Sequence, residues 1–200
     1  AKVIEVIENL CHGCGACNFA CNSGAITKKP VVLGTVNNYT TGRGHLLVEA
    51  RMRVNEMSPV RVIKAAIKEA GEEGTVVLDS PPGTSCPFIQ TVDRADYVLL
   101  VTEPTPFGLS DLRQSVETLK TMNKQYGVII NRADIGDSRV KSYLNQENIP
   151  LLGVINYDTG IARSYSEGRL ITDENDELAG FFTGLAEKII SEHGTGSNQR

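Results

Sequence analysis

Apolar residues beyond residue 55 alternate between two kinds of segment. Continuous apolar runs lie at residues 75–78, 97–102, 127–130 and 151–155, and helical segments separate and follow them. Strands that are apolar throughout are typical of a parallel sheet covered by helices on both faces. The pattern therefore predicts an α/β fold with a mostly parallel sheet. The predicted helices span residues 59–70, 109–123, 137–147, 161–167 and 178–191.

The first quarter of the chain has a different pattern. A short apolar run at residues 3–7 predicts a strand. Two β-like runs, 30–36 and 45–52, flank a separator rich in turn residues at 37–44, which predicts a hairpin. Between the first strand and the hairpin lies a glycine-containing loop that holds four of the five cysteines.

This contrast predicts a division of the chain near residue 55. Residues 1–54 form a small cysteine-rich module, and residues 55–193 form the α/β domain. The polar tail at residues 194–200 is predicted to be disordered.

Composition excludes several classes of protein. The 200 residues carry 20 Lys and Arg against 24 Asp and Glu, for a formal net charge of −4. Nucleic-acid binding normally needs a basic surface, so we expect no nucleic-acid partner. No run of 18 apolar residues exists, and no signal peptide is visible, so we expect no membrane span and a cytoplasmic location.

The four cysteines of the loop have the spacing of an iron–sulfur ligand set. Gly13 and Gly15 lie between them and allow backbone amides to approach the sulfides of a cluster. The run C-x2-C-x2-C-x3-C is the bacterial ferredoxin pattern, although Asn22 replaces the usual proline after it. The predicted metal ligands are Cys11, Cys14, Cys17 and Cys21.

Other interpretations of the cysteines stay open. The run could bind zinc, although structural zinc usually takes two separated C-x2-C pairs, or it could hold ligand-free thiols. We interpret His12 as a solvent-facing neighbour rather than a ligand. In two-cluster ferredoxins the fourth cysteine of each run binds the other cluster, so Cys21 binds either its own cluster or one completed by a second run. Cys86 is the only other thiol.

The stretch D-S-P-P-G-T-S-C-P at residues 79–87 follows the first predicted strand. Ligands of parallel sheets bind beyond the carboxyl ends of the strands, so Asp79 is a candidate for the magnesium side of a nucleotide site. Pro82 and Gly83 form a stiff turn, and the Gly83 amide can point at a terminal phosphate. The alternative is a plain turn between a strand and a helix.

A second candidate lies at the end of the run 127–130. Asn131 can pair with the edge of an adenine through its donor and its acceptor, and Arg132 follows it. A local turn is an equally good explanation of this pair. The proline-containing loop at 102–108 lies at another strand end and could line the same crevice.

These motifs, in this order, resemble the MinD/ParA-type P-loop ATPases that carry an inserted ferredoxin domain. The resemblance rests on the cysteine run, on the stretch 79–87, on T-E-P-T-P-F-G-L at 102–109 and on I-N-R-A-D-I-G at 130–136. It implies a P-loop NTPase-like sheet with a small ferredoxin-like iron–sulfur module, and an ATP-hydrolysing cytoplasmic protein that is often a dimer. It also implies that Asp79 lies on the magnesium side, Gly83 at the γ-phosphate, and Asn131 and Arg132 on the base side.

One part of the family pattern is absent from the chain. No glycine is followed by lysine, so the phosphate-binding loop G-x-x-x-x-G-K-[ST] does not occur. We therefore expect the chain to be the C-terminal part or a subunit of a larger ATPase, with a gap in its sheet and no ATP hydrolysis on its own. ATP and magnesium would bind only with the missing segment or a partner. The alternatives are a ferredoxin-like electron carrier or scaffold and a zinc-stabilised interaction domain.

Overall fold

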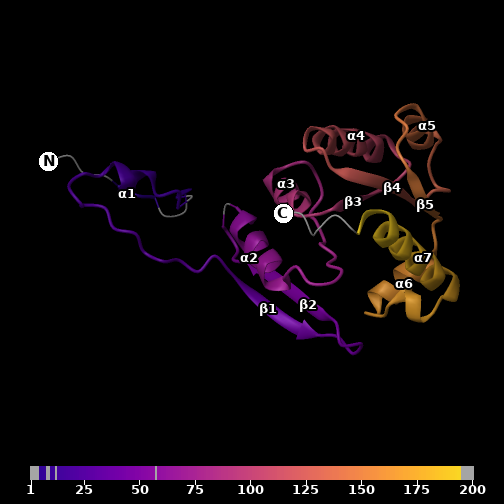
Figure 1. Cartoon of the computed structure of the whole chain (residues 1–200), viewed down its shortest axis with the longest axis horizontal. Helices are drawn as coiled ribbons and strands as arrows, with labels where there is room; N and C mark the ends of the chain where they lie inside the picture. Colours follow the sequence, from indigo (N-terminus) through magenta and orange to yellow (C-terminus); the bar gives the residue numbers. More distant parts are fainter. Residues whose placement is uncertain (1–4, 8–9, 12, 57, 195–200) are drawn as a thin grey trace. The chain divides into compact units, whose positions relative to one another are not determined.

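The computed structural model describes residues 5–7, 10–11, 13–56 and 58–194 (Figure 1). The chain divides into two compact units, residues 1–81 with 85–91 and residues 82–84 with 92–200. The sequence-based boundary near residue 55 stays a prediction, and the predicted disorder at 195–200 falls outside the described residues.

The second unit is built on a parallel sheet of three strands in the order β3-β4-β5. These strands are β3 (Tyr97–Thr102), β4 (Gln125–Asn131) and β5 (Leu151–Ile155). β4 lies between the other two, and its residues 127–130 are all buried. The sheet confirms the predicted fold class, since each continuous apolar run from residue 97 onward forms a strand.

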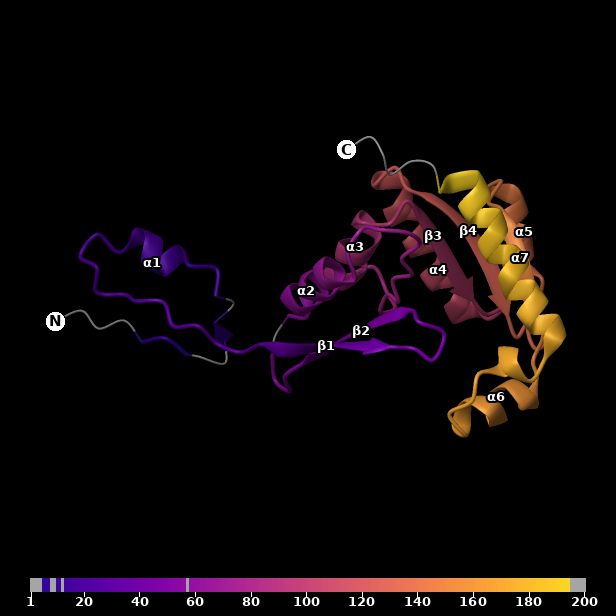
Figure 2. The ribbon, with the colours of Figure 1, turned by 60° about the horizontal axis from the view of Figure 1, so that its bottom comes forward.

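Helices cover both faces of this sheet (Figures 1 and 2). α4 (Pro106–Thr121) and α5 (Arg139–Gln146) pack on one face, and α7 (Asp176–His193) lies against the other. Neighbouring residues of β4 point to opposite faces, so Ile130 faces the first pair and Ile129 faces α7. The main core lies on the side of α4 and α5 and comprises Leu109, Leu112, Val116, Val128, Ile130, Val140, Tyr143, Leu144 and Ile149.

Side-chain caps define where three helices of this unit begin. The Thr105 hydroxyl accepts from the Gly108 N–H at 3.0 Å, so α4 begins at Pro106 and not at residue 109 as predicted. Asp158 caps α6 (Thr159–Ser166), and Asn175 caps α7, after the short 3-10 helix η2 (Ile171–Asp173). Each cap satisfies an N–H group that the first helical turn leaves unpaired.

The first unit contains the predicted hairpin. β1 (Gly34–Thr40) pairs antiparallel with β2 (Leu46–Met52), and α2 (Val60–Ala70) packs on one face of the pair (Figure 2). Val62 is the buried residue of α2. β1 begins four residues later than the sequence predicts, because its ladder with β2 starts at the pair of Gly34 with Met52.

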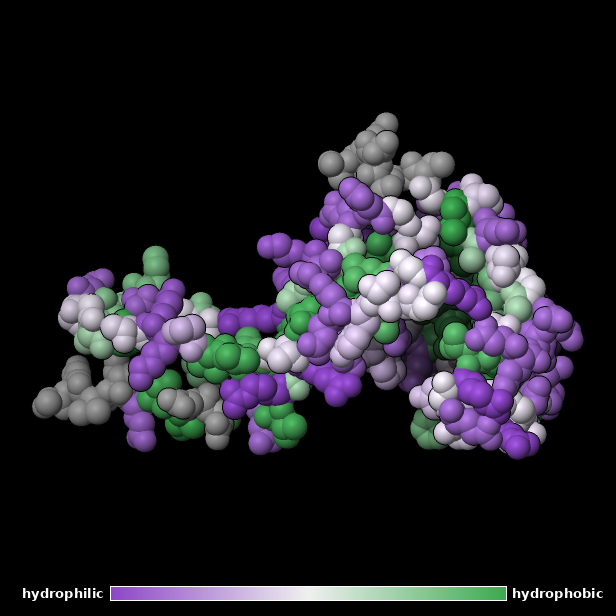
Figure 3. All heavy atoms as spheres, turned by 90° about the horizontal axis from the view of Figure 1, so that it is seen from below, coloured by the Kyte–Doolittle hydropathy of each residue, from purple (hydrophilic) through white to green (hydrophobic). Residues whose placement is uncertain are grey.

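The cysteine-containing part of this unit has little regular structure. α1 (Ala16–Ala20) is its helix, and residues 5–7 of the predicted first strand are not a strand, while residues 3–4 lie outside the described part. Its described apolar side chains are largely exposed, with Phe19 at 92%. Figure 3 shows hydrophobic atoms, in green, at the surface of this part of the chain. A packed ferredoxin-like module therefore stays a prediction.

The predicted strand at residues 75–78 is wrong. Residues 75–80 pair with no other strand among the described residues, and Val76 and Val77 are 40% and 88% exposed. The run has the composition of a buried strand, but a strand exists only where a second one supplies hydrogen-bond partners. α3 (Cys86–Asp93) follows the turn and carries Pro87 in its first turn, where the missing N–H of proline costs no helical hydrogen bond.

Candidate functional sites

The cysteine loop is shaped by two glycines with left-handed backbone conformations. Gly13 has φ +60° and Gly15 has φ +78°, values that residues with a side chain rarely adopt. Gly15 precedes α1, and its carbonyl accepts from the Phe19 N–H at 3.0 Å. The Asn18 side-chain amide donates to the Ile26 carbonyl at 2.6 Å and ties the helix to the segment that follows. The loop thus turns sharply on both sides of Cys14.

The thiols of this loop are accessible and reduced. Cys11, Cys14 and Cys17 are exposed and Cys21 is half-buried, and none forms a disulfide. The Ser23 hydroxyl, 3.4 Å from the Cys21 sulfur, and the backbone around Ala25 lower the pKa of the Cys21 thiol below its usual value. A lower pKa favours the thiolate, which is the form that binds metals.

The four cysteines are the residue type that binds an iron–sulfur cluster, but the structure does not bring their thiols together at one point. Among the residues that the structure describes, no three His, Cys, Asp or Glu side chains lie together as a metal site. Four accessible thiols within eleven positions, on a loop with two glycine turns, are nevertheless the donor set that such clusters take. His12 lies outside the described residues.

The phosphate-side candidates lie on exposed backbone. Asp79 is exposed and ends no strand, contrary to its predicted position, because residues 75–78 form none. Pro82 is also exposed. Gly83 has φ +89°, and a Cβ added there would meet nothing within 4 Å. The Gly83 turn therefore needs glycine for its backbone conformation and leaves space around it.

The base-side candidates lie where the sequence places them, at the carboxyl end of β4. Asn131 is the last residue of the strand, and Arg132 follows with φ +49°, a left-handed conformation for a residue with a side chain. The Arg132 guanidinium lies 3.4 Å from the carboxylate of Glu103, at the end of β3, and 5.8 Å from the ring centroid of Tyr157. These contacts hold the strained residue in place.

Hydrogen bonds join the loops after β4 and β5. The Ala133 N–H donates to the Ile155 carbonyl at 3.0 Å, and the Tyr157 N–H donates to the Asp134 carboxylate at 2.6 Å. The Asp137 N–H reaches across to the Pro104 carbonyl at 3.1 Å. All three strand ends of the second unit are therefore tied together around Asn131.

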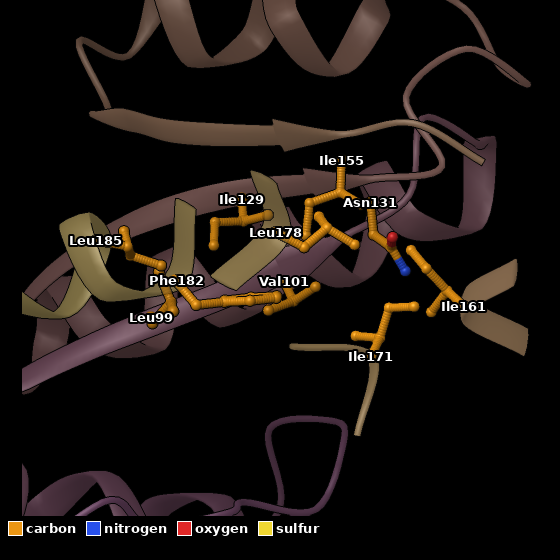
Figure 4. A pocket seen from close by; sticks show the side chains of 10 residues that line it. All are labelled: Leu99, Val101, Ile129, Asn131, Ile155, Ile161, Ile171, Leu178, Phe182 and Leu185. Atoms are coloured by element: carbon orange, nitrogen blue, oxygen red, sulfur yellow. The ribbon is translucent and has the colours of Figure 1, made fainter. Parts of the chain in front are cut away.

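An apolar pocket of about 300 Å³ opens between the sheet and α7 (Figure 4). Asn131 is the polar residue of its lining, and its amide lies at one end of the row of apolar side chains, near Ile161. The pocket combines apolar walls with one group, the Asn131 amide, that can both donate and accept a hydrogen bond. The other lining residues are Leu99, Val101, Ile129, Ile155, Ile171, Leu178, Phe182 and Leu185.

The sequence did not indicate three partners of these sites. Glu103 and Tyr157 contact Arg132, and Arg61 of α2 contacts the cysteine loop through the Gly13 carbonyl. The position of Glu103 directly after β3 was a usable signal for the first, because parallel strands end at the same edge. Nothing in the spacing of the sequence indicates the contact of Arg61.

Comparison with solved structures decides the fold. The MinD cell division protein of Aquifex aeolicus superposes with a TM-score of 0.51 over 66% of this chain and 58% of its own, at 21% sequence identity. The chain has a MinD-like fold. This similarity and the weak similarity to one curated relative confirm the predicted resemblance to the MinD/ParA-type superfamily.

Curated relatives extend the similarity along the chain. Two proteins of Methanocaldococcus jannaschii, MJ0579 and MJ0578, are each 29% identical over 92% and 73% of this chain. The chain spans 64% of the first relative and 51% of the second. The cytosolic Fe-S cluster assembly factor NUBP2 of Rattus norvegicus is 25% identical over 92% of this chain and 76% of its own length. No family model matches the chain.

In the part of the chain that the structure describes, no helix has the length and apolar character that a membrane span requires.

Proposed function

We propose that this chain is part of a cytoplasmic iron–sulfur ATPase that couples nucleotide state to the chemistry of a [4Fe-4S] cluster, by electron transfer or by cluster carriage. The observation that carries the proposal is the exposed C-x2-C-x2-C-x3-C loop in a chain with a MinD-like fold. The similarity to NUBP2, which is named a cytosolic Fe-S cluster assembly factor, supports both the cluster and the location.

In this proposal the loop thiols of Cys11, Cys14, Cys17 and Cys21 hold the cluster. A [4Fe-4S] cluster supplies a centre that takes up and releases one electron. The chain's own residues provide thiolates, and the turns at Gly13 and Gly15 let backbone N–H groups approach the sulfides. Cys21 supplies a thiol whose pKa the neighbouring Ser23 and backbone groups lower.

Iron binding is the direct test of this proposal. The full chain is reconstituted with iron and sulfide without oxygen, and iron, sulfide and visible absorbance are measured. We expect about four irons per protein chain and a brown colour, and we expect Cys14→Ala to lose both. Cys86→Ala is the matched control, because it removes a thiol outside the run. A parent protein that stays colourless and iron-free overturns the proposal.

The same experiment tests the zinc-stabilised interaction domain, which the sequence left open. Tetrahedral thiolate sites bind Zn²⁺ without colour. A parent that takes up one zinc in competition with iron and sulfide, and gains helical structure when it does, would favour the zinc domain. The redox role would then be lost.

The nucleotide part of the proposal assigns Asp79 to the magnesium side, Gly83 to the γ-phosphate and Asn131 with Arg132 to the base. A segment or partner subunit that carries the loop G-x-x-x-x-G-K-[ST] completes the site, because this sequence contains none. One observation supports a completing element: β3 is an edge strand of the described sheet. A homo-oligomer and a separate redox partner belong to the same proposal.

Titration calorimetry with ATP and magnesium tests this second part. We expect no binding tighter than millimolar by this chain alone, and micromolar binding once a segment with the G-K-[ST] loop is present. Asn131→Ala should then weaken binding about tenfold, which corresponds to one lost hydrogen bond to the base. Absence of nucleotide binding in the completed protein, together with a stable cluster, would favour the ferredoxin-like electron carrier or scaffold.

A further inference from the structure

Two basic side chains lie at the two glycine turns of the cysteine loop. The Arg61 guanidinium donates through Nη2 to the Gly13 carbonyl at 2.9 Å. A Cβ built on Gly13 would lie 3.1 Å from Arg61 Nη1, and one built on Gly15 would lie 3.2 Å from Lys28 Nζ. The turns before and after Cys14 therefore each have a cation against the glycine.

Arg61 reaches the loop from a different element of the first unit. It stands in the first turn of α2, which packs on the hairpin of β1 and β2, whereas Lys28 belongs to the segment that follows the cysteine run. The contact of Arg61 is thus a tertiary one, between the helix and the loop. This hydrogen bond connects α2 to the backbone between Cys11 and Cys14.

The bond to the Gly13 carbonyl also orients the next amide. In a trans peptide the C=O and the N–H point in opposite directions, and the peptide bonds of the described chain are all trans. A Gly13 carbonyl held toward Arg61 therefore points the Cys14 N–H toward the other side of the loop. Hydrogen bonds to cluster sulfurs and nearby charge are two of the features that set the reduction potential of such clusters.

We propose that Arg61 is a positioning residue that holds the Gly13 turn and, with Lys28, raises the reduction potential of the cluster bound by this loop. The inference rests on the proposed function. On one-electron reduction by a low-potential donor such as dithionite, a cluster with four thiolates goes from net charge −2 to −3, and no proton is required. Cations beside the loop stabilise the more negative form, so they shift the equilibrium toward reduction.

A purely structural tie would behave differently. Arg61 is exposed, and a hydrogen bond at an exposed site contributes little to the free energy of unfolding. If Arg61 only anchored the loop, its removal would leave the potential of the assembled cluster unchanged. The potential therefore separates the proposed role from a structural one.

The experiment measures the midpoint potential of the reconstituted full chain by anaerobic titration, followed by EPR of the reduced cluster. Arg61→Gln is compared with Lys64→Gln, which removes the same charge from an exposed position one turn along α2. We expect Arg61→Gln to favour the oxidised cluster about tenfold, a fall of about 59 mV for one electron. Lys64→Gln should stay within about twofold of the parent.

Two further variants keep the test decisive. Arg61→Lys retains the charge and should restore most of the potential, and Lys28→Gln should lower it in the same direction as Arg61→Gln. If Arg61→Gln does not hold a cluster, the potentials of Lys28→Gln and Arg61→Lys test the proposal in its place.

The outcomes distinguish this inference from the proposed function. A parent that binds no iron overturns both. A parent that binds a cluster whose potential is the same in Arg61→Gln, Lys28→Gln and Lys64→Gln overturns only the inference, and the proposed iron–sulfur function stands.

Discussion

The run T-V-V-L at residues 75–78 and the run V-L-L-V at 98–101 have nearly the same side chains, yet they differ in structure. The second lies in β3 and pairs with β4, with Leu99 opposite Gly127 and Leu100 opposite Val128. The first has no strand partner among the described residues, and its Val77 is 88% exposed. Apolar composition is thus sufficient for a strand only where a neighbouring strand and a covering helix are present.

The loop after β4, the strand that pairs with the second run, and the loop after the first run differ in the same way. After β4, the loop that begins at Arg132 is fixed by hydrogen bonds to the ends of β3 and β5, including the bond from the Asp137 N–H to Pro104. After the first run, Gly83 has free space around its Cα. A strand that pairs on both sides therefore also orders the loop that carries the candidate residues.

The largest expected effect compares one side chain from each region. Ile130 in β4 is 0% exposed and packs in the core with α4 and α5. Ile130→Ala should lower the free energy of unfolding by about 2–5 kcal/mol, because it removes buried methylenes and leaves a cavity. Val77→Ala should change it by less than about 0.5 kcal/mol. Urea unfolding followed by circular dichroism measures both.

Equal losses in the two variants would contradict the comparison. They would mean that residues 75–78 are packed in solution as firmly as β4. A loss only in Ile130→Ala supports the difference between the two runs.

A smaller effect is expected in the loop after β4. A Cβ on Gly136 would lie 1.9 Å from the carbonyl oxygen of Pro104, which is backbone and cannot move aside easily. Gly136→Ala should therefore cost about 1–3 kcal/mol through overpacking. Gly184→Ala is the matched control on α7, where a Cβ meets nothing, and it should be neutral or stabilise by up to about 1 kcal/mol.

Thermal unfolding of the two glycine variants checks this prediction. A Gly136→Ala protein as stable as the parent would show that the loop after β4 adapts freely. The contrast with the open turn at Gly83 would then disappear.

Most of the second unit was predictable because its signals are local. The strands β3, β4 and β5 and the helices α4 to α7 follow from apolar runs and helical spacing within short windows. Helix starts were less accurate, since the cap at Thr105 lies outside the apolar period of α4. The short helix α1 was not predicted, because its five residues are too few to show an apolar period.

The failure at residues 75–78 has a non-local cause. Whether an apolar run becomes a strand depends on a partner strand that no property of the run itself encodes. The same reason limits the candidate sites. The positions of Asn131 and Arg132 at a strand end were predictable from the apolar run before them. The contacts of Arg132 with Glu103 and Tyr157 and of Arg61 with Gly13 were not, because they join residues far apart in sequence.

The smallest expected effect concerns a single carboxylate in the ordered loop. Hydrogen bonds from the Arg139 guanidinium, at 2.9 and 2.6 Å, and then from the Arg139 N–H lower the pKa of Asp137 below its ordinary value. Because the folded-state pKa is the lower one, the contribution of this carboxylate to stability is present above the unfolded pKa of about 3.9 and is lost as the pH falls through the folded value.

Arg139→Gln should raise the pKa of Asp137 toward, but not to, its ordinary value, because the backbone N–H at residue 139 still donates to the carboxylate. Carboxyl-carbon NMR titration measures this shift. Arg163→Gln is the control, because this substitution removes the same charge elsewhere in the unit. Arg163 lies on α6 and pairs with Glu167, which directly follows that helix. An Asp137 titration that is identical in the parent and in Arg139→Gln would show that the loop does not hold this geometry in solution. The ordered part of the loop after β4 would then end before Asp137, the residue that leads into α5.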